Sequence, residues 1–282
     1  LHASPTCQIA FDAVPAELIG TEGNGLKAMF TMMNHARIDV SLQGVAHASR
    51  AHDIAKTYAQ DRIQGRGKDG TPTAIIHHAP VKQMLDRQRA LALGARLLSH
   101  DAMVAIETGN RALADFLTPV CKVFCTDAGL DAANLGIQVL GGYGYLTDYG
   151  VDQVWRDARI SSIYEGTNEI HAVGLSLRSL QLADGALVKS FQSYLAPNVP
   201  KDLRTLWHAT CDKVAASPDP TLMAVAFMKA TGLIAWIGAL TRLSAASTSS
   251  KEDKSLLPHQ TRIAQQELRH ALAMVEIQSE YP

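Results

Sequence analysis

The chain has 282 residues, 47% of them hydrophobic, so it can bury one sizeable core or two smaller ones. Its 26 basic and 27 acidic residues leave a net charge of −1, which excludes the broad positive field that attracts nucleic acids or anionic membranes. The four cysteines form no Cys-x-x-Cys pair, a usage typical of reduced thiols inside the cell. We therefore expect a globular, cytoplasmic protein with no nucleic-acid or membrane partner.

The amino end predicts little structure of its own. A short apolar run at residues 7–11 can form at most one or two short strands, and a lone strand is not a stable unit. The first residues contain neither a starting Met nor a basic region before an apolar run, so no signal peptide is expected. The sequence therefore reads as a piece of a longer protein.

Helical periodicity dominates the chain from Gly25 onward. Apolar residues at helical spacing predict long helices over 25–64, 80–109 and 111–140, and shorter ones over 151–157 and 167–180. The segment 65–78 carries several glycines and a proline, so it is expected to be a loop. Long helices with short links predict a mainly α fold, an up-and-down helical bundle.

Residues 182–282 predict an additional helical subdomain. Its expected helices cover 184–195, 200–215, 219–246 and 258–280, with an exposed loop over 244–255. The most apolar stretch, 222–243, is interrupted by Lys229 and two glycines. A buried helix is therefore expected there rather than a membrane span.

One carboxylate, Glu165, stands between an aromatic residue and a glycine, just before a helix that opens at Thr167. A carboxylate held in a site that excludes water gains basicity and can abstract a weakly acidic proton. In isolation the residue is better explained as a carboxylate at a helix amino terminus, because the helix dipole favours negative charge there. Gly141 and Gly142, which precede it, can also be a plain helix end.

Several short motifs follow one another in a fixed order. They are residues 11–15 (Phe-Asp-Ala-Val-Pro), 20–25 (Gly-Thr-Glu-Gly-Asn-Gly), Ala36-Arg37, Arg62, His78, 138–145 (Gln-Val-Leu-Gly-Gly-Tyr-Gly-Tyr), 156–159 (Arg-Asp-Ala-Arg) and 163–170 (Ile-Tyr-Glu-Gly-Thr-Asn-Glu-Ile). This ordered set, over about residues 7–180, resembles the acyl-CoA dehydrogenase family. The long tail is similar to the larger bacterial branch that includes methylthiopropionyl-CoA dehydrogenase.

The resemblance implies three parts. Residues 1–22 would be the end of a middle β-domain and a linker, 23–181 the carboxyl-terminal helical bundle, and 182–282 a helical extension. The amino-terminal helical domain and most of the β-domain would lie outside this chain. On this interpretation the chain alone is inactive, because those domains close over the cofactor.

The resemblance also implies FAD-dependent α,β-dehydrogenation of an acyl-CoA thioester to the trans-2-enoyl-CoA, a reaction of fatty acid metabolism. Glu165 would remove the α-proton, while the β-hydrogen leaves as hydride to flavin N5. Some family members carry the base on the first long helix, but Ala36 stands there in this chain. Electron-transferring flavoprotein would reoxidise the flavin, and the enzyme would be a homodimer or a dimer of dimers. An acyl-CoA oxidase and a non-catalytic or DNA-associated relative remain open alternatives.

Binding roles follow from the same resemblance. Cofactor contacts are expected from Arg62, Gln64, His78, Gln138, Gly141, Gly142, Thr167, Asn168 and Glu169. Substrate contacts are expected from Asn34, His35, Arg37, Tyr164 and Gly166. The family uses the glycine cluster to contact the flavin of a neighbouring subunit, and the start of the last helix to contact its own. No metal site is expected, because His77 and His78 have no carboxylate or cysteine at ligand spacing.

Two of the arginines have plainer alternatives. Arg62 can be a solvated cation at a helix end, and Arg37 can be a snorkelling residue or part of an internal ion pair. The loop after Arg62 also departs from the family pattern, since Ile63-Gln64-Gly65 replaces the usual Phe-Gly and Ala79 replaces a usual Gln.

Overall fold

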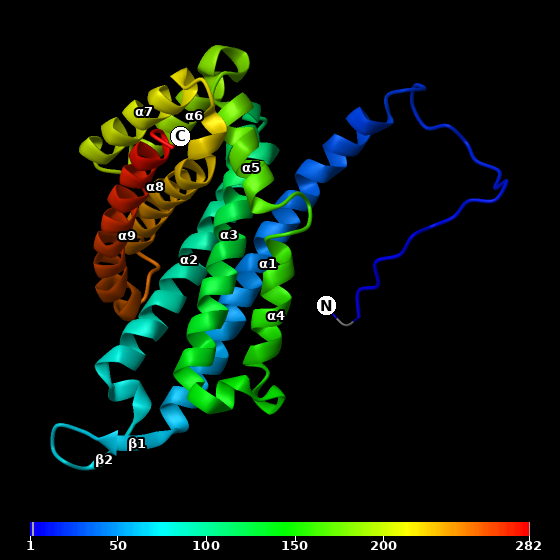
Figure 1. Ribbon diagram of the computed structural model, residues 1–282. Coiled ribbons are helices and arrows are strands. Elements are labelled where there is room, and N and C mark those ends of the chain that lie inside the picture. Colours follow the sequence, from blue (N-terminus) through cyan, green and yellow to red (C-terminus); the bar gives the residue numbers. More distant parts are fainter. Residues whose placement is uncertain (2, 282) are drawn as a thin grey trace.

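The computed structural model describes residues 1 and 3–281. Long helices stand side by side as a tall bundle, and shorter helices cover its upper part (Figure 1). The helices are α1 (Gly25–Asp61), α2 (Ala79–Glu107), α3 (Arg111–Leu140), α4 (Val151–Ser161), α5 (Asn168–Gly174), α6 (Ala186–Leu195), α7 (Lys201–Ala216), α8 (Ala224–Ala245) and α9 (Lys251–Gln278). The predicted mainly α bundle with a further helical part is confirmed.

Two short strands form a hairpin at the foot of the bundle, in a segment that the sequence predicted as a loop. β1 (Ile63–Arg66) pairs antiparallel with β2 (Pro72–Ala74). The carboxylate of Asp69 stabilises the turn by accepting hydrogen bonds from the backbone N–H and the hydroxyl of Thr71, at 3.1 and 2.8 Å. The expected amino-terminal strand is not found among the described residues of 7–11, because this extended segment has no neighbouring strand to pair with.

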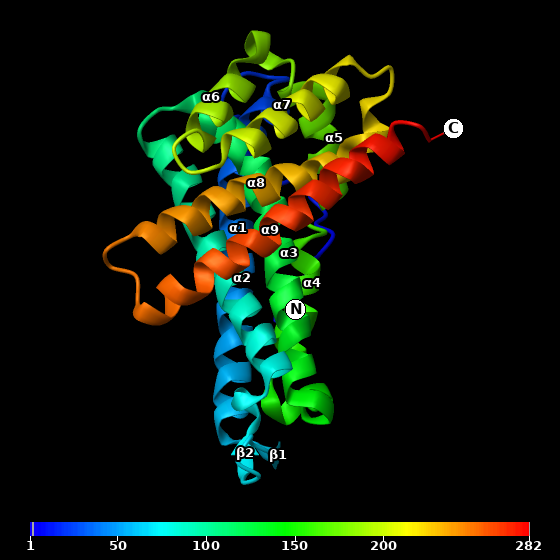
Figure 2. The same ribbon diagram turned by 90° about the vertical axis from the view of Figure 1, so that its left-hand side faces the viewer.

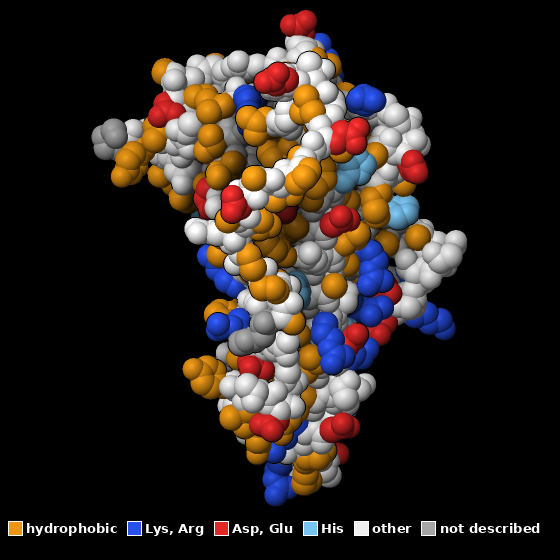
Figure 3. All heavy atoms as spheres, turned by 90° about the vertical axis from the view of Figure 1, so that its right-hand side faces the viewer, with side chains coloured by type: hydrophobic (Ala, Val, Ile, Leu, Met, Phe, Trp, Pro, Cys, Tyr) orange, Lys and Arg blue, Asp and Glu red, His pale blue; other side chains and the backbone are white. Residues whose placement is uncertain are grey.

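The amino-terminal arm and the first turns of α1 present apolar side chains to solvent. Ile9, Phe11 and Ile19 on the arm are 75%, 80% and 94% exposed. Leu26 and Phe30 on α1 are exposed as well. Hydrophobic side chains are spread over the face on which the arm lies (Figure 3). Extended apolar surfaces of this kind mark places where other polypeptide packs.

Helices α1 and α3 cross with their backbones in contact. A Cβ atom added to Gly44 would lie 2.1 Å from the carbonyl oxygen of Cys125, and one added to Gly129 would lie 2.8 Å from the carbonyl oxygen of Gly44. Only residues without a side chain allow this approach. The crossing fixes α3 against α1, and both helices carry predicted site residues.

Helix α8 fixes the extension to the bundle. Trp236 of α8 covers Gly94 of α2, where an added Cβ would lie 2.1 Å from the indole nitrogen, and the indole N–H donates to the carbonyl of Ala90 at 3.2 Å. Figure 2 shows α8 and α9 side by side, crossing the upper half of the bundle at an angle. One continuous cluster of buried side chains includes residues of both parts. The extension and the bundle therefore share a core.

Within the described residues, one helical stretch, Pro220–Ala245, is long and apolar enough to cross a membrane by length and composition. An 18-residue window of this stretch is 83% buried inside the protein, and the stretch contains the eleven consecutive buried residues 230–240 of α8. This is the behaviour of a core helix, as the sequence predicted.

Candidate active site

The predicted site residues form two groups at different levels of the bundle. The upper group is Asn34, His35 and Arg37 on α1, together with residues 164–167 between α4 and α5 and residues 168–169 in the first turn of α5. The lower group lies at the foot of the bundle and consists of Arg62, Gln64, His78, Gln138, Gly141 and Gly142. Helix α3 spans both groups, from Lys122 at the upper level to Leu140 at the lower, and a rise of 1.5 Å per residue separates them by roughly 27 Å.

Glu165 occupies a strained backbone turn. Its φ is 57°, in the left-handed region, and Gly166 follows with φ 84°. For a residue with a side chain this conformation costs roughly 1–3 kcal/mol, so it persists only where neighbouring groups hold it. Two side chains do so: the ammonium of Lys122 donates to the carbonyl of Gly166 at 2.9 Å, and Nε2 of His171 donates to the carbonyl of Glu165 at 3.0 Å.

The Glu165 side chain points into a partly enclosed, positively charged environment. One carboxylate oxygen, Oε2, is buried and has no hydrogen-bond donor among the described residues. Arg37 of α1 lies close enough to interact with it: burial lowers the pKa of Arg37, and the Glu165 charge counteracts that effect. Nη1 of Arg37 donates to Oδ1 of Asn34 at 3.0 Å, which orients the guanidinium. Asn34 and His35 are themselves exposed.

The start of α5 is tied to α3 through Asn168. The side chain of Thr167 caps the helix by accepting from the backbone N–H of Ile170 at 3.3 Å. The amide nitrogen of Asn168 donates to Asp127 at 2.8 Å and to Thr126 at 3.1 Å. Its amide oxygen accepts from Lys122 at 2.8 Å. Both ends of the Asn168 side chain thus bond to α3, and its backbone N–H donates to the carbonyl of Ser162 at 3.1 Å, so the donors of this residue are engaged within the protein.

Tyr164 and Glu169 lie on the two sides of this turn. The hydroxyl of Tyr164 donates to the side chain of Gln43 on α1, which connects the turn to the first helix. Glu169 is exposed in the first turn of α5. The carboxylate of Glu169 is therefore open to solvent, whereas that of Glu165 is partly enclosed.

Four residues of the lower group, Arg62, Gln64, Gly141 and Gly142, line a recess of about 380 Å³. Arg62 donates to Oε1 of Gln64 at 3.4 Å, and its guanidinium lies 5.7 Å from the centre of the Tyr143 ring. Among the described residues, Gly141 and Gly142 have no atom within 4 Å of an added Cβ, so this side of their backbone is open to a ligand. The recess is lined by Tyr58, Arg62, Gln64, Leu140, Gly141, Gly142, Tyr143 and Leu146. A cation and accessible backbone suit the diphosphate of a nucleoside diphosphate, and the aromatic rings suit its base.

The other two predicted cofactor residues of the lower group, His78 and Gln138, differ in whether their side chains are bonded within the protein. Nε2 of His78 donates to the carbonyl of Gln64 at 2.7 Å, so this ring helps to fix the hairpin. Gln138, in the last turn of α3, is exposed and open to a ligand.

Sequence reasoning missed Lys122, whose side chain is 0% exposed. Burial lowers its pKa to about 8, and the charge of Asp127 partly opposes this effect. The available signal was a lysine between Cys121 and Val123 in an otherwise apolar part of α3. A lysine on an apolar helix commonly extends its charged end to solvent, so the pattern alone did not indicate burial.

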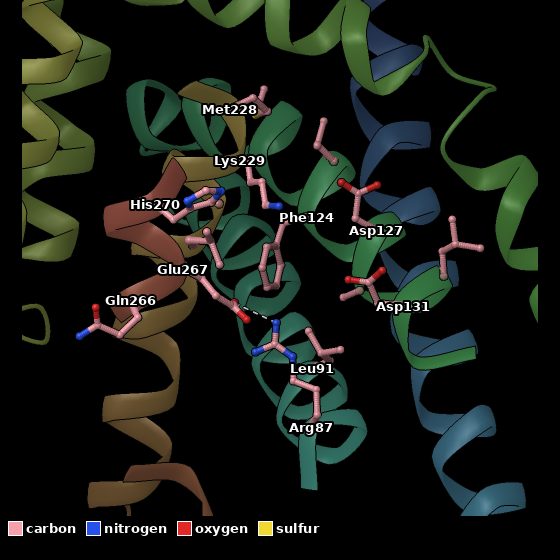
Figure 4. Close-up of a pocket in the computed structure, with 15 residues that line it drawn as sticks. Arg87, Leu91, Phe124, Asp127, Asp131, Met228, Lys229, Gln266, Glu267 and His270 are labelled. Carbon is pink, nitrogen blue, oxygen red and sulfur yellow. Dashed lines mark hydrogen bonds and ion pairs between the residues drawn. The ribbon is translucent and has the colours of Figure 1, made fainter. Parts of the chain in front are cut away.

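A second feature missed from the sequence is a recess of about 610 Å³ between the bundle and the extension. Phe124 lies in its centre, with Asp127 and Asp131 on one side and His270 on the other (Figure 4). The ion pair between Arg87 and Glu267, at 2.9 Å, closes its lower edge (Figure 4). Helices far apart in sequence form this recess, which the pattern of any one helix could not indicate.

Sequence comparison decides the family. The family model for the acyl-CoA dehydrogenase carboxyl-terminal domain matches residues 23–178. The chain belongs to the acyl-CoA dehydrogenase family. The family predicted from the ordered motifs is thereby confirmed.

Two curated acyl-CoA dehydrogenases illustrate the similarity. The chain is 40% identical over 215 residues to 3-methylmercaptopropionyl-CoA dehydrogenase of Ruegeria pomeroyi, which covers 70% of this chain and 36% of that protein. It is 34% identical over 202 residues to the broad-specificity linear acyl-CoA dehydrogenase FadE5 of Mycobacterium tuberculosis, covering 64% of this chain and 33% of that protein. The chain thus spans about a third of the length of these curated relatives.

A solved structure extends the comparison to the whole fold. An acyl-CoA dehydrogenase from Bacillus anthracis, complexed with FAD, matches with a TM-score of 0.72 at 18% identity, over 92% of this chain and 51% of that chain. The match reaches well beyond residues 23–178. The arrangement of much of the extension therefore also occurs in a solved acyl-CoA dehydrogenase.

One prediction concerns His171, which supports the Glu165 turn. Burial lowers its pKa to about 4, and the charges of Arg37 and Lys122 add to this. The unfolded chain binds the proton at about 6.5, so acidification from pH 6.5 to 4 favours unfolding, by at most roughly 3 kcal/mol. In the full-length protein, we expect His171→Gln to flatten the fall of the melting temperature between pH 7 and 4.5.

The control for this prediction is the exposed His208, in a His208→Gln variant. The control should keep the pH dependence of the parent protein. If the melting temperature falls with pH equally steeply in the His171 variant and the parent, His171 is not the titrating group.

Proposed function

We propose that the full-length protein oxidises an acyl-CoA thioester to the trans-2-enoyl-CoA, and that Glu165 removes the α-proton. The observation that carries this proposal is the Glu165 carboxylate: it sits in a strained turn, and its buried Oε2 has no donor from residues 1 and 3–281. An oxygen without a donor is free to accept a proton. A strained residue that neighbouring groups hold in place is typical of a working site.

The turn also offers a donor for the thioester. Removing the α-proton places negative charge on the thioester oxygen, and a fixed N–H group lowers the energy of that charge. The backbone N–H of Glu165 has no acceptor within the described part of the chain. We assign it to the thioester oxygen. Arg37 and Tyr164 would border the substrate on either side, with Asn34 and His35 toward the CoA moiety.

The two residue groups fit FAD held between two chains. Bound FAD supplies the acceptor for the β-hydride. Thr167 and Glu169 would hold it through N–H groups at the start of α5, next to the base, while Asn168 fixes that start to α3. The recess at Arg62 and Gly141–Gly142 lies roughly 27 Å away along α3 and would hold the adenosine diphosphate part of a partner's cofactor. This supports a homodimer or a dimer of dimers.

The parts of the chain would then have distinct roles. The exposed apolar residues of the arm and of the start of α1 support the division at residues 1–22, because a preceding β-domain would cover them. Residues 23–181 would form the catalytic bundle, and 182–282 an extension that stiffens it through α8. We propose a cytoplasmic enzyme whose flavin is reoxidised by electron-transferring flavoprotein.

Anaerobic mixing of the FAD-loaded, full-length protein with saturated acyl-CoAs tests the proposal. The panel should include 3-methylmercaptopropionyl-CoA and linear chains, the substrates named for the two curated relatives. We expect the flavin absorbance to bleach and a trans-2-enoyl-CoA to form. Absence of bleaching with every member would refute the proposal. Hydrogen peroxide release in air, without electron-transferring flavoprotein, would instead identify an oxidase.

A further inference from the structure

We propose that Lys122 is a positioning residue for Glu165, whose turn it fixes to α3. The inference rests on the proposed function, because the position of Glu165 affects catalysis only if Glu165 is the base. It concerns a residue that lies outside the motifs and outside the expected contacts with substrate and cofactor.

The contacts of Lys122 all serve the turn and the helix that follows it. Its Nζ donates to the carbonyl of Gly166 at 2.9 Å and to Oδ1 of Asn168 at 2.8 Å. These partners lie 44 and 46 residues away in sequence, so the bonds join α3 directly to the segment between α4 and α5. Hydrogen bonds from a charged donor are stronger than neutral ones, which suits a fixed geometry.

Burying the ammonium group of Lys122 is unfavourable unless its partners compensate for the lost hydration. An ammonium group removed from water loses several kcal/mol of hydration unless charged or polar partners compensate. An aliphatic side chain would fill the same space in α3 without that cost. The lysine therefore fits a role that needs its donors, and both partners found for them belong to the Glu165 turn or the first residue of α5.

The bond to Gly166 acts where the backbone is least stable by itself. Glu165 holds a left-handed conformation that its side chain disfavours, and the peptide that accepts from Lys122 is the next one along the chain. Without this bond the turn can relax toward an ordinary backbone conformation, which would swing the carboxylate away from the substrate. His171 alone would then hold the carbonyl of Glu165.

A purely structural role would give a different outcome from a positioning role. A buried residue that only stabilises the fold changes the amount of folded protein but leaves the chemistry of folded molecules intact. A residue that positions the base slows α-proton removal in molecules that remain folded and bind substrate. Small displacements of a reacting group, near 1 Å, can reduce rates by about 100-fold.

The test uses the full-length, FAD-loaded protein with Lys122→Met, an unbranched side chain one atom shorter that lacks the donors. We expect kcat to fall at least about 10-fold, with KM for acyl-CoA within about threefold and FAD retained. The kinetic isotope effect with α-deuterated acyl-CoA should rise, because proton abstraction becomes slower than the other steps. Lys122→Gln, which keeps an uncharged N–H donor, should recover part of kcat.

Thr118→Val is the matched control on α3. Thr118 is buried one turn before Lys122, and its hydroxyl donates within its own helix, to the carbonyl of Ala114 at 2.8 Å. The control variant should keep the kcat and isotope effect of the parent. If Lys122→Met does not fold, Lys122→Leu, which also lacks the donors, takes its place. A folded variant without these donors that shows the parent's kcat and isotope effect would overturn the inference.

A parallel Glu165→Gln variant separates the two proposals. If Glu165→Gln keeps turnover, the proposed function itself fails. If Glu165→Gln is inactive while the Lys122 variants match the parent in kcat and isotope effect, the base is correct and only the role of Lys122 is wrong.

Discussion

Replacement of Glu165 by Gln in the full-length, FAD-loaded protein should reduce the rate of flavin bleaching by about 10²–10⁴-fold, the usual contribution of a general base. The amide has the shape of the carboxylate but cannot take up the α-proton at neutral pH. Because the backbone turn depends on bonds to carbonyl groups, the variant should keep its fold and its FAD. Stopped-flow absorbance under anaerobic conditions measures the rate directly.

A matched carboxylate far from the site provides the control for this variant. Glu276 on α9 is exposed and pairs with Lys213 of the extension, so Glu276→Gln should bleach at the parent's rate. Equal rates for the Glu165 variant and the parent would remove Glu165 from the mechanism. A loss of FAD in the Glu165 variant would assign it to cofactor binding instead.

The second large effect concerns stability and is expected at the crossing of α1 and α3. Gly44→Ala places a methyl carbon 2.1 Å from the carbonyl oxygen of Cys125, a contact that only separation of the two helices can relieve. Overpacking of this kind costs about 1–3 kcal/mol or more, and rigid backbone as the obstacle favours the upper end. Ala gains about 1 kcal/mol of helix propensity over Gly, so we expect a net loss of about 2 kcal/mol.

Gly25→Ala on the same helix controls for the propensity gain. No atom lies within 4 Å of a Cβ added to Gly25, so this variant should be as stable as the parent or slightly more stable. Thermal unfolding of the full-length protein, followed by circular dichroism, compares the two. A melting temperature for Gly44→Ala equal to that of Gly25→Ala would contradict the close crossing.

The long helices could be predicted from the sequence because their ends carry local signals. Helix α3 occupies the predicted residues 111–140, since Asn110 caps its start and Gly141 ends it with a positive φ. The hairpin after α1 was missed because its glycines indicated only a loop. An Asp-Gly pair at residues 69–70 is a hairpin signal. The strands on either side of it are only four and three residues long, which is too short for a strand pattern to stand out in the sequence.

The start of α9 shows where local signals mislead. The sequence placed it at Pro258, a residue that favours the first turn of a helix. The helix begins at Lys251, because Ser250 accepts from the backbone N–H of Asp253 at 3.0 Å and Arg89 of α2 holds the Asp253 carboxylate. Part of that cap comes from another helix, which no local pattern contains.

The candidate site likewise has features that the sequence could predict and features that it could not. Glu165 and the glycines at 141 and 142 belong to a motif, so a resemblance could single them out. The left-handed turn at Glu165 and the inward direction of the Asn168 side chain depend on Lys122 and Asp127. These partners come from α3, more than 40 residues away, and bury groups that a sequence pattern would place in water. Contacts of this range become visible only in the folded chain.

The dense burial of α8 has a consequence for how the protein is made. A helix this apolar would bind to other exposed chains or to membranes if it stayed uncovered. Synthesis runs from the amino end, so α2 and α3 leave the ribosome before α8 does. Gly94 and its neighbours are therefore already available when Trp236 emerges. The order of synthesis thus shortens the time during which the nascent chain exposes the apolar helix α8.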